Sequence, residues 1–278
     1  MNETEAHKKK KGLLEALKRL DRVLVAFSGG ADSSFLLGAA HEVLGEGVTA
    51  ATAQSAVHSA RERKNARAFT GARGIPHVFF PSRELELSEF VANGPDRCYH
   101  CKRAMMRDLK RIAGLQGIPH VIHGANRDDL GDYRPGMRAA EEAGVGAPLL
   151  DAGLTKEDIR FLSKEIGLPS WNVPPMACLA SRIPYGRTIA VKDLEAVDEA
   201  EELLLGLGFS HVRVRHYGSL ARIEIAPSEF EKLVRDGLRN SVIKEFQRIG
   251  FNHVTIDLEG YVQGKMNRDL NKRAAGPS

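Results

Sequence analysis

A serine- and glycine-rich stretch near the start of the chain has the residue types of a phosphate-binding loop. Residues 23–27 are apolar, and residues 28–34 read Ser-Gly-Gly-Ala-Asp-Ser-Ser. Paired glycines let backbone N–H groups approach an anion, and serine hydroxyls add donors. A helix that begins at about Asp32 would point its positive end at the same anion. The stretch predicts a polyphosphate site formed by Ser28, Gly29, Gly30, Asp32, Ser33 and Ser34.

This loop differs from two familiar nucleotide-binding loops. It lacks the spacing and the lysine of a Walker A loop, and it lacks the GxGxxG pattern of dinucleotide-binding folds. It resembles the pyrophosphate loop of the N-type ATP pyrophosphatases, which split ATP between the α and β phosphates and adenylate an oxygen of a second substrate. The simpler interpretation, a glycine turn between strand and helix, is less favoured because strand, loop and helix follow in the order that the motif requires.

A second loop with carboxylates follows a later apolar segment. Residues 119–124 predict a strand, which runs directly into Gly-Ala-Asn-Arg-Asp-Asp at 124–129. Gly124 and Asp129 are the candidate residues, because this loop suits contact with adenine or ribose and carboxylate oxygens suit Mg²⁺. The alternative is that Asp128 and Asp129 only cap the next helix. We favour a functional role because two such loops flank one predicted site.

The three cysteines are an odd number, and two of them lie in a short motif. Cys98 and Cys101 are part of Cys-Tyr-His-Cys, and Cys178 lies in the proline-rich stretch 173–186. In a cytosolic protein this pattern indicates a metal, a cluster or redox chemistry rather than a structural disulfide. A zinc site would need a fourth ligand such as His100. The plainest alternative is that Cys98 and Cys101 are thiols at a helix start and that Cys178 acts alone in its loop, where catalytic residues concentrate.

Three arginines are candidates for binding a second, anionic substrate. Arg213 and Arg215 lie two apart on a predicted strand, so both point to one face and could clamp a phosphate. Arg182 follows Cys178 in the same proline-rich stretch. Glu224, on the partner strand, could balance the arginines or bind a metal. The alternative is a strand face with ordinary cross-strand ion pairs.

Alternating strands and helices must position these loops. Strands predicted at 23–27, 48–53, 77–80 and 119–124 are separated by helical segments, which indicates a parallel sheet with right-handed crossovers. Open sheets of this kind bind ligands at the carboxyl edge of the strands. After Val191 a helix, two hairpin strands, further helices and a last strand predict a small α+β module. We therefore predict an α/β domain over 1–187 and an α+β domain over 188–278.

Composition limits the partners. The net charge of +4 over 278 residues suits anionic ligands such as nucleotides but is too weak to indicate nucleic acid. No run of about 18 apolar residues predicts a membrane span. The first twelve residues are polar, with four consecutive lysines at Lys8–Lys11 that we interpret as a frayed tail, and they lack the apolar core of a signal peptide. A cytoplasmic location is expected.

Four segments taken together resemble one family. The loops at 28–34 and 124–129, the Cys-Tyr-His-Cys motif and Ala-Cys-Leu-Ala-Ser-Arg-Ile-Pro-Tyr-Gly at 177–186 occur in this chain in the order found in LarE, the ATP-dependent sulfur transferase family of nickel-pincer cofactor synthesis. The resemblance covers about residues 13–267, and the Cys178 segment is its most specific part. It implies a PP-loop ATP pyrophosphatase domain, an adenine nucleotide α-hydrolase-like α/β fold, followed by the smaller α+β domain.

The resemblance also implies a reaction. ATP and Mg²⁺ would adenylate a carboxylate of pyridinium-3,5-biscarboxylic acid mononucleotide, sulfur would displace AMP to leave a thiocarboxylate, and a second round would convert the other carboxylate. This small molecule would be the substrate, with no nucleic acid or membrane involved. The resemblance further implies a homo-oligomer, a hexamer built from dimers or trimers.

Two sulfur sources occur in the family. Some members give up the sulfur of the cysteine that matches Cys178 and keep dehydroalanine, whereas others hold a [4Fe–4S] cluster on three cysteines, whose open iron can bind sulfide. Cys98, Cys101 and Cys178 match the second group, which is the favoured expectation. One departure from the family is Val262 in Gly-Tyr-Val, where we expect Gly-Tyr-Arg.

Rival functions remain within and outside this class. A GMP synthetase-like or NAD synthetase-like amidating ligase and a tRNA thiolase share the first loop. A GMP synthetase would bring a glutaminase domain, for which the residues before Leu13 leave no room, and a tRNA thiolase would show paired zinc-knuckle cysteines. A non-catalytic nucleotide sensor is the rival from another class, and Cys178 in its proline-rich loop argues against it.

Overall fold

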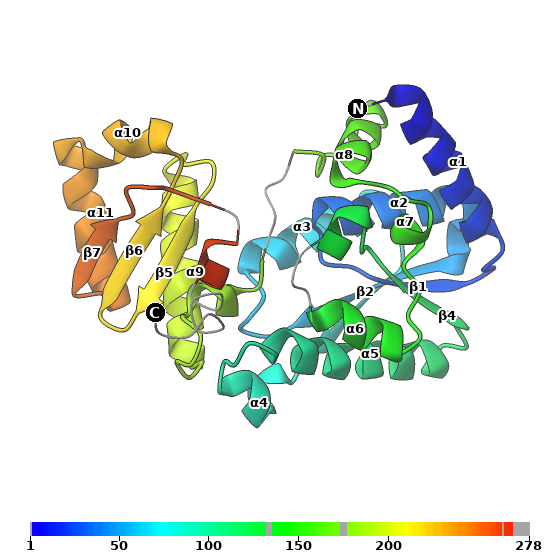
Figure 1. Ribbon diagram of the computed structural model, residues 1–278, viewed down its shortest axis with the longest axis horizontal. Helices are drawn as coiled ribbons and strands as arrows, with labels where there is room; N and C mark the ends of the chain where they lie inside the picture. Colours follow the sequence, from blue (N-terminus) through cyan, green and yellow to red (C-terminus); the bar gives the residue numbers. More distant parts are fainter. Residues whose placement is uncertain (1, 132–134, 173–176, 263, 269–278) are drawn as a thin grey trace, which may run out of the picture. The chain divides into compact units, whose positions relative to one another are not determined.

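The chain forms two compact units, each described by itself. The computed structural model describes residues 2–131, 135–172, 177–262 and 264–268 (Figure 1). The first unit comprises Met1–Leu87 and Asp96–Met176, and the second comprises Ser88–Pro95 and Ala177–Ser278. These units divide the chain earlier than the boundary expected at 187/188, and they assign a short early segment to the second unit. The division at 187/188 stays a prediction.

The first unit is built on a four-stranded parallel sheet, as the alternating pattern predicted. The strand order is β3-β2-β1-β4. The strands are β1 (Val23–Ala26), β2 (Val48–Gln54), β3 (His77–Pro81) and β4 (His120–His123). β1 lies between β2 and β4, with Val23 opposite both Val48 and His120. The carboxyl end of β1 is therefore central in the sheet, and the predicted α/β class is confirmed.

Helices cover both faces of this sheet (Figure 1). They are α1 (Glu3–Lys18), α2 (Ala31–Leu44), α3 (Ala60–Gly71), α5 (Arg97–Leu115), α6 (Pro135–Glu142), α7 (Pro148–Asp151) and α8 (Lys156–Glu165), with 3₁₀ turns η1 (Gly45–Gly47), η2 (Glu84–Glu86) and η3 (Arg127–Gly131). Side-chain hydroxyls or amides begin several of them: Ser59 caps α3, and Thr155 with Asp158 forms a capping box on α8. In the described part of the chain, every helix is too short or too polar to cross a membrane.

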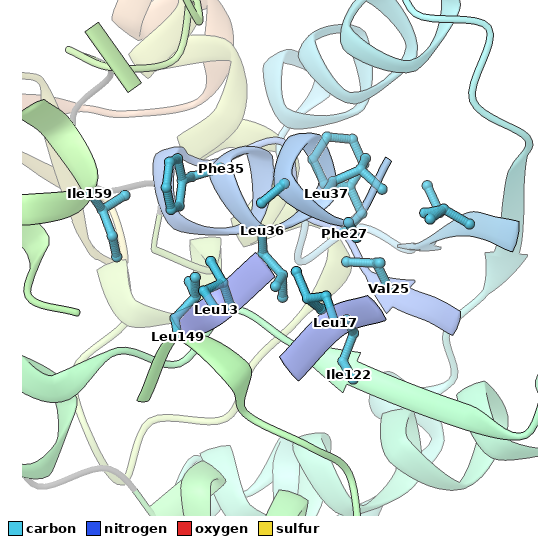
Figure 2. Close-up of a cluster of buried hydrophobic side chains, with 14 of the residues drawn as sticks. Leu13, Leu17, Val25, Phe27, Phe35, Leu36, Leu37, Ile122, Leu149 and Ile159 are labelled. Atoms are coloured by element: carbon cyan, nitrogen blue, oxygen red, sulfur yellow. The ribbon is translucent and has the colours of Figure 1, made fainter. Parts of the chain in front are cut away.

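The alternation of side chains along β1 separates two apolar cores. Val23 and Val25 pack with α1, α2, α7 and α8, in the cluster that Figure 2 shows around Leu13, Leu17 and Phe35. Leu24 points to the other face and packs with Met106 and Leu109 of α5 and with other residues of that core. Burying both faces of β1 fixes its register, because a slip by one residue would exchange the two cores.

The lysine run is not a frayed tail. α1 begins at Glu3, and the Asn2 side chain accepts a hydrogen bond from the Glu5 N–H at 3.3 Å. Lys9 donates to Asp158 of α8 at 2.8 Å. The lysines therefore belong to a helix whose Leu13 and Leu17 are fully buried, and the Lys9 and Lys10 side chains are themselves only 19% and 17% exposed. The interpretation as a tail was wrong because it considered charge without the apolar spacing that continues through the segment.

The second unit is a small α+β structure, as predicted. Its sheet has the order β5-β6-β7, with β5 (Arg213–Tyr217) antiparallel to β6 (Leu220–Glu224) and β6 parallel to β7 (His253–Ile256). Its helices are α4 (Ser88–Val91), α9 (Val191–Gly206), α10 (Phe230–Val234) and α11 (Asp236–Ile249), with 3₁₀ turns η4 (Leu179–Arg182), η5 (Pro227–Glu229) and η6 (Lys265–Asn267). Its separate core contains Leu204, Ile223 and Phe246. A unit with its own core can position a loop independently of the first.

Candidate active site

The serine- and glycine-rich loop connects β1 to α2, as its sequence predicted. Gly30 is the N-cap of α2, and Gly29 has a φ of +77°, which favours glycine. The Ser33 hydroxyl lies 3.1 Å from both the Ser28 hydroxyl and the Gly30 carbonyl oxygen. These contacts hold the loop against the first turn of α2, where unpaired backbone N–H groups can bind an anion. Ser34 is 1% exposed, and its hydroxyl has no hydrogen-bond partner among the described residues.

The second predicted loop lies directly against this turn. A Cβ placed on Gly124 would be 3.1 Å from the Ser33 nitrogen and 3.3 Å from the Asp32 carbonyl carbon. Any larger residue at 124 would have to move one of the two backbones. The structure therefore brings together the loops after β1 and β4, which are neighbours in the sheet. This is the carboxyl edge at which open α/β sheets bind ligands.

Asn126 connects the carboxylates of the two loops. This side chain is fully buried, and its amide donates to Asp32 Oδ2 at 3.0 Å. Its backbone N–H donates to Asp129 Oδ2 at 3.1 Å, and Lys156 Nζ lies 3.3 Å from the other Asp129 oxygen. Carboxylate oxygens from two loops therefore lie around one asparagine, and oxygens are the ligands that Mg²⁺ prefers. Asn126 lies inside the predicted loop 124–129 but is not among its predicted site residues, Gly124 and Asp129.

His123 ends β4 beside the same loops. Burial and the nearby Lys102 ammonium lower the pKa of His123 to about 4, although Asp129 acts in the opposite direction. The imidazole is therefore neutral at pH 7. Because Lys102 follows Cys101 in α5, its electrostatic effect on His123 indicates that the start of α5 lies near the carboxyl end of β4.

His77 supports the strand that leads into the phosphate loop. Its Nε2 lies 2.8 Å from the Thr52 hydroxyl, which donates to the Phe27 carbonyl, and its Nδ1 lies 2.9 Å from the Thr70 hydroxyl. Thr52 therefore accepts from Nε2–H, and the unprotonated Nδ1 can accept from Thr70. Burial, with a smaller effect of Arg67, lowers the pKa of His77 to about 4.

The first prediction concerns acid stability. Both histidines are neutral in the fold and have an ordinary pKa of 6.5 when unfolded, so unfolding takes up protons below that pH. Their contribution is complete above pH 6.5 and is lost as the pH falls to about 4. At about 1.4 kcal/mol per pKa unit, each histidine contributes at most roughly 3 kcal/mol to the free energy of unfolding. His77 contributes less than this because it is partly exposed. Urea unfolding at pH 7 and 4.5 measures the decrease in the free energy of unfolding between these two pH values. This decrease should be smaller in His77→Gln. If the stability of His77→Gln fell with pH as much as that of the parent protein, the neutral state assigned to His77 in the fold would be wrong.

The cysteines are divided between the units. Cys98 and Cys101 lie three residues apart at the start of α5 in the first unit, so they share one side of the helix, and Cys178 lies in the second unit. None of the three forms a disulfide. Across the described residues, no group of three or more His, Cys, Asp or Glu side chains is arranged to hold a metal ion. The pair on α5 offers two thiolates for a cluster and not three, so the cluster stays a prediction from the sequence.

Cys178 is held by its own loop and by Arg182. It is the N-cap of η4, and residues 173–176 of the predicted proline-rich loop lie outside the described residues. Arg182 is 3% exposed and donates from Nη1 to the carbonyl oxygens of Ala177 at 2.5 Å and Cys178 at 3.2 Å. The arginine predicted to bind substrate thus also fixes the backbone of the cysteine loop.

Glu201 is a buried residue of this unit that is not among the site residues predicted from the sequence. Its two carboxylate oxygens each accept from Arg182 at 2.8 Å, and Oε1 also accepts from the Val214 N–H. Burial opposes its ionisation, but the Arg182 guanidinium and these hydrogen bonds hold the pKa of Glu201 below its usual range. A signal was present, because Glu201 occupies the apolar stripe of α9 with Leu194, Val197 and Leu204.

Arg215 and Glu224 form a second buried pair next to the cysteine loop. Arg215 donates to Glu224 at 2.7 Å and to the Ser181 carbonyl at 3.0 Å, and Arg222 donates to the other Glu224 oxygen at 3.1 Å. Arg213 lies over the Tyr261 ring at 5.1 Å. The predicted set Arg182, Arg213, Arg215 and Glu224 therefore lies in one unit, where Arg182 pairs with Glu201 and Arg215 pairs with Glu224. Binding of a substrate phosphate by this set stays a prediction.

Two relatives match nearly the whole chain, and a third matches about two thirds of it. No protein-family model matches it. It is 41% identical over 264 residues to an uncharacterised protein of Synechocystis, covering 95% of this chain and 98% of that protein. It is 38% identical over 267 residues to the pyridinium-3,5-bisthiocarboxylic acid mononucleotide synthase of Lactiplantibacillus plantarum, covering 95% of each. An uncharacterised protein of Methanocaldococcus jannaschii is 35% identical over 178 residues, 64% of this chain and 68% of that protein.

Proposed function

The chain belongs to the LarE family, and on that premise we propose that it is an ATP-dependent sulfur transferase of nickel-pincer cofactor synthesis. Its substrate is pyridinium-3,5-biscarboxylic acid mononucleotide, and its product carries thiocarboxylates. The 38% identity to a bisthiocarboxylic acid mononucleotide synthase over nearly the full length of both chains is the observation that carries this proposal. The match includes residues of both units, so we expect the activity to need both of them.

The first unit supplies the adenylating half-reaction. Backbone N–H groups of the loop after β1 and the start of α2 bind the phosphates of ATP, with Ser28, Gly29, Gly30, Asp32, Ser33 and Ser34 as the loop residues and Gly124 keeping the second loop close. Asp32 and Asp129 would hold Mg²⁺, which neutralises charge on the departing pyrophosphate. A substrate carboxylate oxygen attacks the α phosphorus, and pyrophosphate leaves. The acyl adenylate then has AMP as its leaving group.

The second unit supplies the sulfur step. Arg182 donates to the Cys178 carbonyl, Arg215 donates to the Ser181 carbonyl and to Glu224, and Arg213 belongs to the same unit. Three arginines suit a substrate that carries a phosphate and two carboxylates. For the sulfur itself we retain two sources, a [4Fe–4S] cluster on Cys98, Cys101 and Cys178 or the sulfur atom of Cys178. The second source is supported by two hydrogen bonds to the Cys178 carbonyl oxygen, whose donors, the Ser181 N–H and Arg182, belong to the same unit as Cys178.

Pyrophosphate release tests the proposed function. The protein should release pyrophosphate from Mg·ATP only when the pyridinium dicarboxylate mononucleotide is present, and mass spectrometry should find the thiocarboxylate. Release without a sulfur product but with added ammonia or glutamine would identify an amidating ligase. Binding of ATP with no release under any of these conditions would identify a nucleotide sensor. Either result would overturn the proposal.

Iron analysis separates the two sulfur sources. Protein prepared without oxygen should contain iron and acid-labile sulfide near four of each per chain if the cluster is present. Protein without iron should instead lose the mass of one H₂S at Cys178 after turnover. Each source gives a signal of its own, so either the bound iron or the mass loss at Cys178 identifies the sulfur donor.

Asn126 gives a prediction for the first unit. Asn126→Ala removes the donor to Asp32, and hydrogen bonds to charged groups contribute about 1.5–3 kcal/mol. We expect the KM for Mg·ATP to rise roughly tenfold or more, since the two carboxylates are no longer held together. Steady-state pyrophosphate release measures this, and Asn240→Ala, at an exposed position of α11, is the control. An unchanged KM in Asn126→Ala would show that the hydrogen bond from Asn126 to Asp32 is not needed to bind Mg·ATP.

We also propose a homo-oligomer in the cytoplasm, with a hexamer as the expected form. Light scattering after size-exclusion chromatography measures the mass directly. A monomer across the accessible concentration range would contradict this part of the proposal and leave the chemistry untouched.

A further inference from the structure

A buried carboxylate lies at the carboxyl edge of the first unit's sheet, outside the site described above. Glu84, in η2, is 1% exposed, and its two oxygens accept hydrogen bonds from the Ser55 and Ser82 hydroxyls. Ser55 is the first residue after β2, and Ser82 is the first residue after β3. Glu84 therefore joins the ends of two neighbouring strands, and hydrogen bonds at both oxygens offset the cost of burying its charge.

The Ser55 hydroxyl also determines where the His58 ring carries its proton. Ser55 Oγ lies 3.2 Å from His58 Nδ1. Because the single hydrogen of this hydroxyl is donated to Glu84, Ser55 can only accept from the imidazole, and the network assigns the proton to Nδ1. Burial lowers the pKa of His58; the Glu84 charge opposes this effect, and Lys102 and Arg63 add to it. The imidazole is therefore neutral at pH 7.

The other nitrogen of this ring is a hydrogen-bond acceptor. A neutral imidazole with its proton on Nδ1 keeps a lone pair on Nε2. His58 is half-buried, and in the described part of the chain its Nε2 makes no hydrogen bond. The fold thus holds an acceptor in a fixed tautomer and leaves it available to a ligand that donates.

His58 lies beside the phosphate loop. It precedes α3 by two residues, and Arg63 Nη1 of α3 donates to the His58 carbonyl at 2.6 Å. α3 packs on the phosphate loop, since a Cβ on Gly29 would be 3.2 Å from the Glu62 carbonyl oxygen. In the sheet, β1 lies between β2 and β4. The loops after β2 and β4 therefore lie on either side of the loop after β1.

The donors of Mg·ATP limit what His58 can bind. The ionised triphosphate offers acceptors, so the donors are the ribose hydroxyls and the exocyclic amine of adenine. Hydroxyls also accept, and the carboxylates of the loop after β4 suit them. The amine only donates, which matches a lone pair on a neutral ring. Guanine and hypoxanthine carry a carbonyl oxygen at the same position, and two acceptors facing each other would disfavour binding.

We propose that His58 Nε2 accepts a hydrogen bond from the adenine amine, so that the first unit selects ATP over nucleotides without this amine. Ser55 and Glu84 are positioning residues, because they hold His58 in the accepting tautomer. This inference rests on the proposed function only in its use of ATP. The plainer interpretation, that these three residues only fix the loop after β2, predicts no preference that depends on the base.

Binding of matched nucleotides tests the proposal without turnover. Purine riboside 5′-triphosphate is ATP without the amine, and 2′-deoxy-ATP lacks one ribose hydroxyl. Isothermal titration calorimetry of the full chain, with Mg²⁺ at neutral pH, gives a Kd for each. We expect purine riboside triphosphate to bind roughly tenfold more weakly than ATP, the size of one net hydrogen bond. Inosine triphosphate should bind more weakly still, because its carbonyl oxygen would face the lone pair.

Variants assign the preference to His58. His58→Leu should bind ATP and purine riboside triphosphate equally, and His58→Gln, whose amide oxygen can accept, should keep part of the preference. Ser55→Ala retains His58 but removes the acceptor of Nδ1–H. The ring can then carry its proton on Nε2, so the preference for ATP should shrink. His120→Leu is the control, because His120 is exposed at the start of β4, at the opposite edge of the sheet, and this variant should behave as the parent.

The outcomes separate this inference from the proposed function. An equal preference for ATP in the parent and in His58→Leu would overturn the inference. If His58→Leu changed only the preference for ATP over 2′-deoxy-ATP, the nitrogen would bind ribose, which also overturns it. A chain that makes thiocarboxylate but binds all these purine triphosphates alike keeps its function and loses this inference. A chain that selects ATP but releases no pyrophosphate with the dicarboxylate substrate does the reverse, and a chain that binds no nucleotide loses both.

Discussion

Cys178→Ala is expected to release pyrophosphate from Mg·ATP in the presence of the dicarboxylate substrate and to form no thiocarboxylate. The loop after β1 belongs to the first unit and does not contain this thiol, so adenylation should survive. The sulfur step has no nucleophile at position 178, and the acyl adenylate can only hydrolyse. Coupled measurement of pyrophosphate and, by mass spectrometry, of product checks both halves on one sample. Loss of both activities together would show that Cys178 is needed for folding or nucleotide binding rather than for sulfur.

Cys98→Ala is the matched variant that separates the two sulfur sources. If Cys178 gives up its own sulfur, Cys98→Ala should still form product, limited to one thiocarboxylate group per chain. If a cluster supplies the sulfur, the same variant loses a ligand and should lose iron and product together. Cys98 is exposed on α5, so its replacement should change stability little. The pair of variants therefore gives opposite results under the two alternatives.

The sheet of the first unit could be predicted because its signals are local. The apolar run at β1, the glycine loop and the periodicity of α2 are adjacent in sequence, and hydrophobic burial decides each of them separately. The two cores confirm the reasoning, since Val25 and Leu24 occupy opposite faces of β1. Placing two loops at one edge then followed from the parallel connections alone.

The features of the fold and the site that could not be predicted from the sequence depend on contacts between residues far apart in the chain. The residue types of Asn-Gly-Pro-Asp at 93–96 are typical of a turn, yet Asn93 is fully buried and donates to the Ile183, Pro184 and Arg187 carbonyls, within the second unit. No local pattern encodes a contact across about ninety residues. For the same reason a sequence shows that Asn126 lies in a loop but not that it reaches Asp32.

The arginines show how a correct residue can be given an incomplete role. Charge and spacing favoured Arg182 and Arg215 as phosphate ligands, but both donate to backbone carbonyls of the cysteine loop. A guanidinium has five donors in a fixed plane and can bind a carboxylate and a backbone segment together. Sequence gives the donors, and only the fold shows which acceptors are nearby. The positioning of Cys178 is therefore the feature that needed the structure.

Glu201→Ala is expected to destabilise the second unit by about 3–5 kcal/mol, because it leaves the Arg182 charge buried without its partner. Val214 also loses the acceptor for its backbone N–H at the start of β5. The only tryptophan, Trp171, lies in the first unit, so fluorescence is a poor probe of this change. Hydrogen exchange followed by mass spectrometry, on peptides from α9 and β5, reports on the second unit directly.

Glu202→Ala is the control for this prediction, since Glu202 is the next residue of α9 and is exposed. Its loss should change stability by no more than about 0.5 kcal/mol. Arg182→Met combined with Glu201→Leu removes both charges and should recover part of the stability, because apolar residues can replace a buried ion pair at little cost. Recovery should be incomplete, as the Ala177 and Cys178 carbonyls lose their side-chain donor. If α9 and β5 were equally protected from hydrogen exchange in Glu201→Ala and Glu202→Ala, the Arg182–Glu201 pair would not hold the cysteine loop in place.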